Sequence, residues 1–361
     1  MDLNLSPGTR SKLTTLRRQY FQLVDPAQLI WPDEESLKAV DAQSWMFNNL
    51  FDVDNISYPP PEQYQLRVLK LLISKLERAF VDPEKDEISD DLMSALSVLL
   101  CSSIPPEPIS VQQKAFVTYA FPTRSNGDSV SDDCTVTVLE SRSVLSSFGT
   151  TGLRTWEASL PLAAFLTSER GRAMLEGKRV FELGAGTGML SILCAKYLGL
   201  SGVVATDGDE GIVDALKSNI FLNGLDAEES SHSIIRTAAL KWGWPLDASS
   251  FAEDYGMEIP DVLLGADVTY DKSAVPSLVS SLREFFDLNS SLQVLIAAII
   301  RNEQTFEAFQ NACKRNGFSL DLVDFPQVPE YLQDGPFYPT SIPIQIWQIT
   351  RRGECRDGFS L

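Results

Sequence analysis

The first hundred residues carry apolar side chains at the spacing of three and four residues that is typical of amphipathic helices. In the clearest stretch they alternate with charged residues at Leu69, Leu72, Ile73, Leu76 and Phe80. A second predicted helix runs from Ser89, a candidate N-cap, to Leu100, and an earlier one covers Leu13 to Leu23. The pattern predicts a mostly helical N-terminal domain without chemistry of its own. Packing is its simplest role.

Further along, the pattern changes to short apolar runs separated by turn residues. Phe116–Phe121 and Cys134–Leu139 predict a β-hairpin with a long turn. From about residue 178, strands alternate with amphipathic helices that begin at Gly188 and Glu210, which indicates a wound α/β sheet. The predicted strands are Arg179–Leu183, Val203–Asp207, Ser233–Arg236, Asp261–Ala266, Gln293–Ile300 and Ile344–Ile349.

The length of 361 residues favours two domains. Three prolines, Pro105, Pro106 and Pro108, interrupt the chain between the helical and the α/β patterns. We therefore expect a helical domain over residues 1–108, and a hairpin followed by the α/β domain over residues 109–361.

Charge and composition narrow the class of protein. Hydrophobic residues make up 44% and charged residues 22%, as in soluble globular proteins. The 49 acidic against 30 basic residues give a net charge of −19, a field that repels nucleic-acid phosphates and favours a lysine-bearing protein partner. The chain offers neither an apolar run of about 20 residues nor a basic leader followed by an apolar one. We expect a cytoplasmic protein that binds neither membranes nor nucleic acid directly.

The sequence gives little support for a metal site or for a disulfide framework. The five cysteines are Cys101, Cys134, Cys194, Cys313 and Cys355. They are widely spaced and contain no CxxC pair, which argues against a zinc site and a disulfide framework and for a reducing compartment. His232 is the only histidine, so a metal cluster or a Ser-His-Asp triad would rest on one residue.

The segment Glu182-Leu183-Gly184-Ala185-Gly186-Thr187-Gly188 lies where a predicted strand ends and a helix begins. Its glycines allow the backbone to turn sharply and to approach a ligand closely. The spacing is not the G-x-G-x-x-G of dinucleotide folds, because the third glycine follows the second after only one residue. The acidic residue and three glycines resemble the first motif of S-adenosylmethionine-dependent methyltransferases. As a lone motif it is also compatible with an ordinary glycine-rich turn.

Two further strands end in acidic residues. Asp207 closes the strand after the glycine turn, where a wound sheet places an acceptor for two ribose hydroxyls, although it could instead cap the helix that begins near Glu210. Asp267 and Tyr270 form a D-x-x-Y at the end of a later strand, at the sheet edge where ligands bind. The alternative there is a helix cap at Asp267 with a buried Tyr270.

Three segments together carry a more specific resemblance. Thr150–Trp156, Leu240–Gly243 and Ala266–Tyr270 are similar to the corresponding segments of the seven-β-strand protein-lysine methyltransferases of the family-16 group, and the similarity covers about residues 145–350. It implies a seven-stranded Rossmann-like domain, S-adenosylmethionine as cofactor, and lysine methylation of a protein. Lys241 departs from the acidic or polar residue frequent in the family, but its side chain can point away from the cofactor.

The resemblance also implies roles for individual residues. The expected cofactor contacts are Trp156, Glu182, Gly184, Ala185, Gly186, Asp207, Trp242 and Ala266. Asp267 and Tyr270 would be catalytic: Asp267 would orient the substrate amine and stabilise its developing charge, and Tyr270 would shape the pocket. Trp156 and Trp242 also have an ordinary reading as core residues.

The helical extension and the T-G-L-x-T-W-E-A sequence resemble those of family members that act on translation elongation factor 2. The resemblance therefore implies that this factor is the substrate, and we expect the helical domain to help select it. We also expect the enzyme to be a monomer. Two alternatives stay open: another acceptor, such as a different protein lysine, an N-terminal amine or a small molecule, and a methyltransferase-like scaffold without activity.

Overall fold

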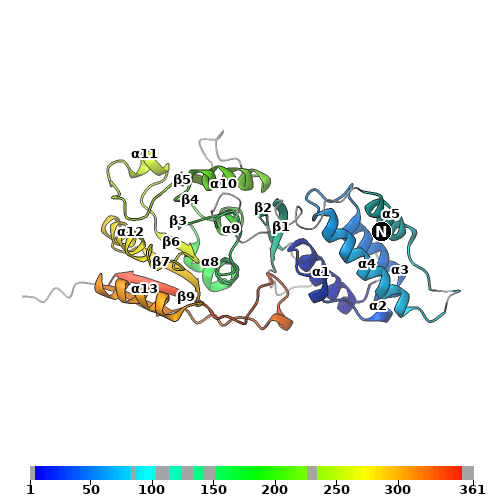
Figure 1. Cartoon of the computed structure of the whole chain (residues 1–361). Helices are drawn as coiled ribbons and strands as arrows, with labels where there is room; N and C mark the ends of the chain where they lie inside the picture. The colour runs from blue at the N-terminus through cyan, green and yellow to red at the C-terminus, as the bar shows by residue number, and fades with distance from the viewer. Residues whose placement is uncertain are drawn as a thin grey trace, which may run out of the picture. The chain divides into compact units, whose positions relative to one another are not determined.

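The computed structural model describes residues 5–82, 84, 86–102, 114–122, 133–141, 151–225 and 234–351 (Figure 1). Pro105, Pro106, Pro108, His232 and Cys355, and with them the predicted domain boundary, lie outside the described residues. The chain divides into two compact units. Unit 1 comprises residues 1–124, 130–149 and 333–337, and unit 2 comprises residues 125–129, 150–332 and 338–361.

Unit 1 is built on helices, as the apolar spacing predicts. They are α1 (Pro7–Phe21), η1 (Pro26–Gln28), α2 (Glu34–Lys38), α3 (Val40–Met46), η2 (Phe47–Phe51), α4 (Glu62–Ala79) and α5 (Asp90–Cys101). The predicted apolar stripe of α4 enters the unit's core, where Leu69, Leu72 and Leu76 are fully buried together with Leu16 of α1. Ser89 occupies the predicted N-cap position of α5, although its side chain makes no capping hydrogen bond.

The predicted hairpin is present and belongs to unit 1. Strands β1 (Lys114–Phe121) and β2 (Cys134–Ser141) pair antiparallel, with Phe116 opposite Leu139. Next to β2, the Asp133 carboxylate accepts two hydrogen bonds from Arg18 of α1, at 2.7 and 2.8 Å. The hairpin is therefore tied to the helices, whereas the sequence analysis grouped it with the α/β domain. The boundary near residue 108 itself stays a prediction.

A short segment from late in the sequence completes unit 1. Arg18 donates to the carbonyl of Asp334 at 2.9 Å. The Gln22 amide both donates to the Phe337 carbonyl and accepts from the Phe337 N–H, the latter at 2.9 Å. Residues 333–337 are thus held against α1, about 315 positions away along the chain.

Unit 2 contains a seven-stranded sheet of order β5-β4-β3-β6-β7-β9-β8. Its strands are β3 (Arg179–Leu183), β4 (Gly202–Asp207), β5 (Ile235–Ala239), β6 (Val262–Ala266), β7 (Gln293–Ile299), β8 (Phe318–Leu322) and β9 (Ile344–Arg351). The first five pair parallel, and β9 pairs antiparallel with both β7 and β8. The predicted fold class is confirmed. The predicted strand from Ser233 begins later, at Ile235, and β8 was not predicted.

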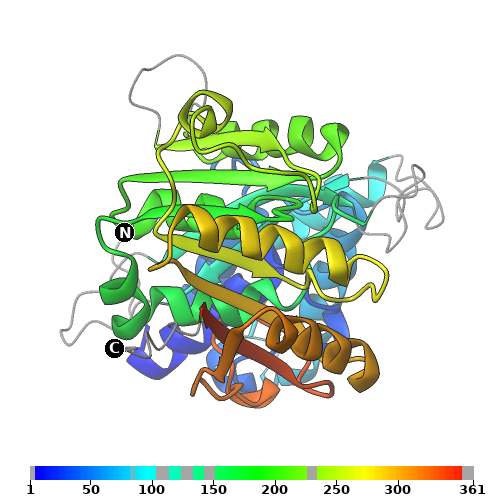
Figure 2. The same ribbon diagram turned by 90° about the vertical axis from the view of Figure 1, so that its left-hand side faces the viewer.

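Helices cover both faces of this sheet. They are α7 (Ser159–Thr167), α8 (Glu169–Leu175), α9 (Met189–Tyr197), α10 (Glu210–Leu222), α11 (Phe251–Tyr255), α12 (Val275–Leu288) and α13 (Glu303–Arg315), with the short η3 (Glu330–Leu332). Phe181 and Leu183 of β3 pack with Phe285 of α12 and Phe309 of α13 in one core, and Figure 2 shows α12 and α13 on this face. Glu182, between them in sequence, points to the opposite face and contacts Ser191 of α9.

The structure also bears on membrane insertion and on disulfide bonds. Among the helices in the described ranges, none is long and apolar enough to cross a bilayer. Among the cysteines in the described part of the chain, Cys101, Cys194 and Cys313 are free thiols.

Candidate functional site

The glycine turn between β3 and α9 depends on three residues with positive φ. Gly184, Gly186 and Gly188 have φ angles of 65°, 55° and 79°, a region that side chains disfavour. Gly188 is the N-cap of α9, and a Cβ there would lie 1.9 Å from Cδ1 of Leu216. The N–H of Ala185 donates to the Thr206 carbonyl at 2.8 Å, which fixes the turn against β4. The glycines are thus required by backbone conformation and by close packing.

Residues from two other strand ends lie against this turn. A Cβ on Gly184 would be 3.3 Å from Cζ2 of Trp242 and 3.1 Å from Cγ1 of Val268. Trp242 follows β5, Val268 follows β6, and the Trp242 side chain is half-buried against the core. The segments after β3, β5 and β6 therefore meet at the carboxyl edge of the sheet, where open α/β sheets bind ligands.

Asp207, the last residue of β4, lies at the same edge. Its carboxylate accepts hydrogen bonds from the N–H groups of Gly186 and Asp209, each at 3.2 Å. Burial raises the pKa of Asp207, while these N–H donors lower it. The helix cap proposed as its alternative role belongs to Asp209, whose carboxylate accepts from Gly211 and Ile212 at the start of α10. Asp207 is thus held over the glycine turn.

The Glu182 side chain takes a different direction. It is buried on the α9 side of β3, and its carboxylate accepts a hydrogen bond from the Ser191 hydroxyl. Burial raises the pKa of Glu182 to about 8. The carboxyl group is buried and bonded to Ser191, and its direct contact with the cofactor stays a prediction. Ala266, by contrast, is the last residue of β6 and pairs with Ala297 of β7 at that edge.

Asp267 directly follows β6 with a left-handed backbone, at φ 56°. Such a conformation costs a non-glycine residue about 1–3 kcal/mol and is concentrated at functional sites. Its N–H donates to the Ala297 carbonyl at 2.8 Å, which holds the residue at the end of the sheet. The predicted alternative of a helix cap is wrong, because α12 begins only at Val275 and its N-cap is Ala274.

The Asp267 carboxylate is buried and paired with a cation. Arg301, which follows β7, donates from Nη1 to Oδ2 of Asp267 at 3.0 Å. Burial raises the pKa of Asp267, and the Arg301 guanidinium acts in the opposite direction. The main chain adds a longer contact of 3.5 Å from the Ile299 N–H to Oδ1.

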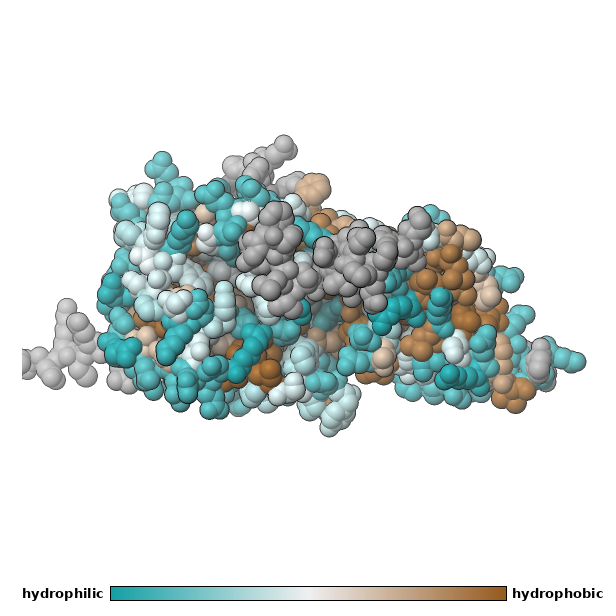
Figure 3. Space-filling view, in the orientation of Figure 1, coloured by the Kyte–Doolittle hydropathy of each residue, from teal (hydrophilic) through white to brown (hydrophobic). Residues whose placement is uncertain are grey.

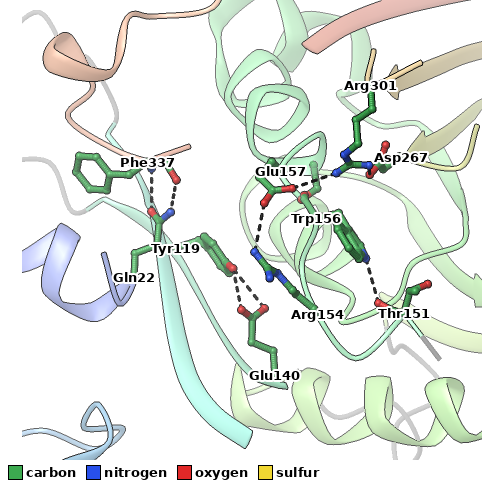
Figure 4. A network of polar contacts seen from close by, with 11 residues as sticks. Gln22, Tyr119, Glu140, Thr151, Arg154, Trp156, Glu157, Asp267, Arg301 and Phe337 are labelled. Atoms are coloured by element: carbon green, nitrogen blue, oxygen red, sulfur yellow. Dashed lines mark hydrogen bonds and ion pairs between the residues drawn. The ribbon is translucent and has the colours of Figure 1, made fainter. Parts of the chain in front are cut away.

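Arg301 extends this pair into a network that the sequence analysis missed. Its Nη2 lies 3.5 Å from Oε2 of Glu157, and Glu157 in turn pairs with Arg154 at 3.3 Å, as Figure 4 shows. We call Arg154, Glu157, Asp267 and Arg301 the Arg301 network. One signal could have revealed it: Arg301 follows a predicted parallel strand, and the carboxyl ends of parallel strands meet at one edge.

Trp156 lies within this network. The guanidinium carbons of Arg301 and Arg154 lie 5.2 and 5.5 Å from its ring centroid, a distance at which cations interact with aromatic faces. Its indole N–H donates to the Thr151 carbonyl at 3.0 Å. The side chain is half-buried, so it is not a plain core residue.

Tyr270 is the most exposed of the predicted site residues. Its side chain is 61% exposed, so the predicted alternative of a buried Tyr270 is wrong. The structure thus brings Gly184, Gly186, Asp207 and Trp242 together around the glycine turn. It joins Asp267 to Trp156 through Arg301.

The sequence is similar to those of several known proteins. A family described as lysine methyltransferase matches residues 142–315. The protein-lysine N-methyltransferase EFM3 of Chaetomium thermophilum is 42% identical over 92% of this chain and 96% of its own length. EFM3 of Saccharomyces cerevisiae is 30% identical, covering 80% of this chain and 85% of its own. The human protein-lysine N-methyltransferase EEF2KMT is 27% identical over 74% of both chains.

Proposed function

Because this chain belongs to the lysine methyltransferase family and is an S-adenosylmethionine-dependent protein-lysine N-methyltransferase, we propose that it methylates translation elongation factor 2 at the carboxyl edge of its sheet. The human relative carries the name EEF2KMT, and the T-G-L-x-T-W-E-A sequence independently implied the same substrate. One observation carries the choice of site: the glycine turn, Asp207 and Asp267 lie at the carboxyl ends of the neighbouring strands β3, β4 and β6. The free thiols of Cys101, Cys194 and Cys313 suit a reducing compartment, and we propose that the protein is cytoplasmic.

The residues around the glycine turn fit the cofactor. A side chain at Gly184 would crowd Trp242 and Val268, and one at Gly186 would lie 3.1 Å from the Gly152 carbonyl oxygen, so the turn keeps its surface clear. The Asp207 carboxylate can accept hydrogen bonds from two ribose hydroxyls. The Trp242 ring offers an apolar surface to an adenine ring. S-adenosylmethionine, when bound here, supplies a methyl group activated by a positively charged sulfur.

Asp267 is proposed to orient the substrate amine. Methyl transfer requires a neutral amine, and with an ordinary lysine pKa of about 10.4 this costs about 4–5 kcal/mol at pH 7. Exclusion of water lowers the pKa of the amine and reduces that cost. As the nitrogen forms its new bond to carbon it becomes positively charged, and the Asp267 carboxylate stabilises this charge. Tyr270, being exposed, is suited to meet the incoming substrate.

Unit 1 is proposed to recognise the protein substrate. On α5, Met93, Val98 and Leu100 are 41%, 69% and 55% exposed, although the same helix buries Leu92 and Leu99. Figure 3 shows hydrophobic residues gathered on unit 1 around the position of α5 in Figure 1. Contiguous exposed apolar surface of this kind is typical of protein-binding sites.

The test uses purified elongation factor 2 and S-adenosylmethionine with a radiolabelled methyl group. We expect the wild-type protein to label a lysine of the factor. Asp267→Ala should abolish labelling while calorimetry still detects cofactor binding. Asp271→Ala is the matched control, because Asp271 is an exposed aspartate four positions away that bonds only locally to Ser273.

Two results would contradict the proposal. Full activity of Asp267→Ala would remove the catalytic assignment. If the wild-type protein labelled a different protein in a whole-cell extract and left elongation factor 2 unlabelled, the substrate would be wrong.

A further inference from the structure

Arg301 places a positive charge beside the carboxylate that is proposed to orient the substrate amine. Its guanidinium contacts the buried Asp267 carboxylate at 3.0 Å, and its own side chain is 39% exposed. It comes from the segment after β7, whereas Asp267 follows β6 and Glu157 and Arg154 precede α7. The guanidinium group supplies one positive charge.

The charges of the Arg301 network balance. Asp267 and Glu157 contribute two negative charges, and Arg301 and Arg154 contribute two positive charges. A lone carboxylate beside the substrate lysine would favour the ammonium form and oppose proton loss. A carboxylate already paired with a guanidinium has much less of this effect, yet its oxygens can still accept a hydrogen bond from the amine.

We propose that Arg301 is a positioning residue for methyl transfer: it balances the charge of Asp267, so that the substrate lysine can release its proton beside a carboxylate. The inference rests on the proposed function. In the reaction the ammonium loses a proton to solvent, the nitrogen lone pair forms the N–C bond, and the S–C bond breaks to leave S-adenosylhomocysteine. Arg301 acts on the first of these events, through Asp267.

Removal of one charge from the Arg301 network should shift the pKa of the substrate lysine in a direction set by the sign of the removed charge. In Arg301→Met the network gains a net negative charge, which should raise the pKa of the bound lysine by about one unit, the lower end of the usual range because Arg301 is partly exposed. In Glu157→Gln the network gains a net positive charge, which should lower the pKa of the lysine. The double variant restores neutrality, and Arg301→Lys keeps the charge.

The measurement is the single-turnover rate of labelling of elongation factor 2 between pH 6 and 10, because this rate reports chemistry rather than product release. We expect the pH of half-maximal rate to move up by about one unit in Arg301→Met, with about a tenfold lower rate at pH 7. It should move down in Glu157→Gln, and lie within a few tenths of the wild-type value in the double variant and in Arg301→Lys. Cofactor binding by calorimetry checks that each variant is folded.

A purely structural role for Arg301 would lower the rate by the same factor at every pH. Unchanged midpoints in both single variants, or shifts of the same sign in both, would overturn the inference. Failure of the proposed substrate is a distinct outcome, because the wild-type protein itself would then leave elongation factor 2 unlabelled. The same profiles would in that case be measured with the protein that the enzyme labels in the extract.

Discussion

The buried carboxyl group of Glu182 makes the stability of unit 2 depend on pH. Burial raises the pKa of Glu182 from its ordinary 4.5 to about 8, while the Ser191 hydroxyl supplies one hydrogen bond. At a pH between these two pKa values, Glu182 has lost its proton in the unfolded chain and keeps it in the folded chain. Stability contributed by a neutral Glu182 is therefore complete below pH 4.5 and is lost as the pH rises toward 8.

The size of this effect follows from the two pKa values. Each pH unit in the window costs the folded state about 1.36 kcal/mol, which sums to about 3 kcal/mol at pH 7 and about 1 kcal/mol at pH 5. Glu182→Gln keeps the shape and an acceptor for Ser191 but cannot ionise. We expect the free energy of unfolding of the variant, relative to wild type, to rise by about 2 kcal/mol from pH 5 to pH 7.

Scanning calorimetry can measure this difference. The transition of unit 2 is identified as the one that moves up when S-adenosylmethionine is added, and the comparison is then made without the cofactor. For a unit of this size, about 2 kcal/mol corresponds to about 4–8 °C in melting temperature. Any packing difference between Gln and Glu is the same at both pH values and cancels from the comparison.

Glu176→Gln serves as the control, because Glu176 is an exposed glutamate at the end of α8. It should melt in parallel with the wild-type protein at both pH values. If the gap between Glu182→Gln and wild type were equally large at pH 5 and pH 7, the Glu182 carboxyl would ionise normally in the fold, and the reasoning from burial would be refuted.

Two further predictions concern the glycine turn and Asp207. Gly188→Ala should destabilise unit 2 by about 2–4 kcal/mol, since its Cβ would meet Leu216 at 1.9 Å with φ at 79°. Gly199→Ala, with φ 61° and open space around its Cβ, should cost only about 1–2 kcal/mol, and equal melting temperatures for the two would contradict the steric argument. Asp207→Ala should weaken binding of S-adenosylmethionine by about tenfold to a hundredfold in calorimetry, whereas Asp209→Ala should mainly lower stability, by about 1 kcal/mol. Unchanged affinity in Asp207→Ala would remove its assignment to the cofactor.

The fold could be predicted because its strongest signals are local. The strand Arg179–Leu183 and the helix that begins at Glu210 lie where apolar periodicity and turn residues place them. Strand β8 was missed although its sequence, Phe-Ser-Leu-Asp-Leu, alternates apolar and polar residues. It is a short edge strand whose burial does not follow that alternation, because Phe318 is fully buried but Leu322 is 55% exposed. The grouping of the hairpin with unit 1 depends on Arg18 and Asp133, 115 positions apart, and no local pattern reveals such a pair.

The residues of the candidate site also differ in whether a local sequence pattern or a distant contact reveals them. The glycine turn, Asp207 and Asp267 could be found because each lies at the carboxyl end of a recognisable strand. Arg301 also follows a predicted strand, but its pairing with Asp267, 34 positions away, was not predicted because that contact depends on the order of the strands in the sheet. The orientation of Glu182 toward α9 is set by the alternation of side chains along β3, which the motif alone does not take into account.

The hydrogen bonds between α1 and its C-cap and residues 333–337 limit where the chain can be truncated. A fragment that stops before residue 333 would strip the helical unit of a piece supplied from more than three hundred positions downstream. A fragment that ends near residue 108 would also lack the hairpin. A single cut therefore cannot divide the chain into two complete units. A frameshift before residue 333 should disturb the fold of the N-terminal helices.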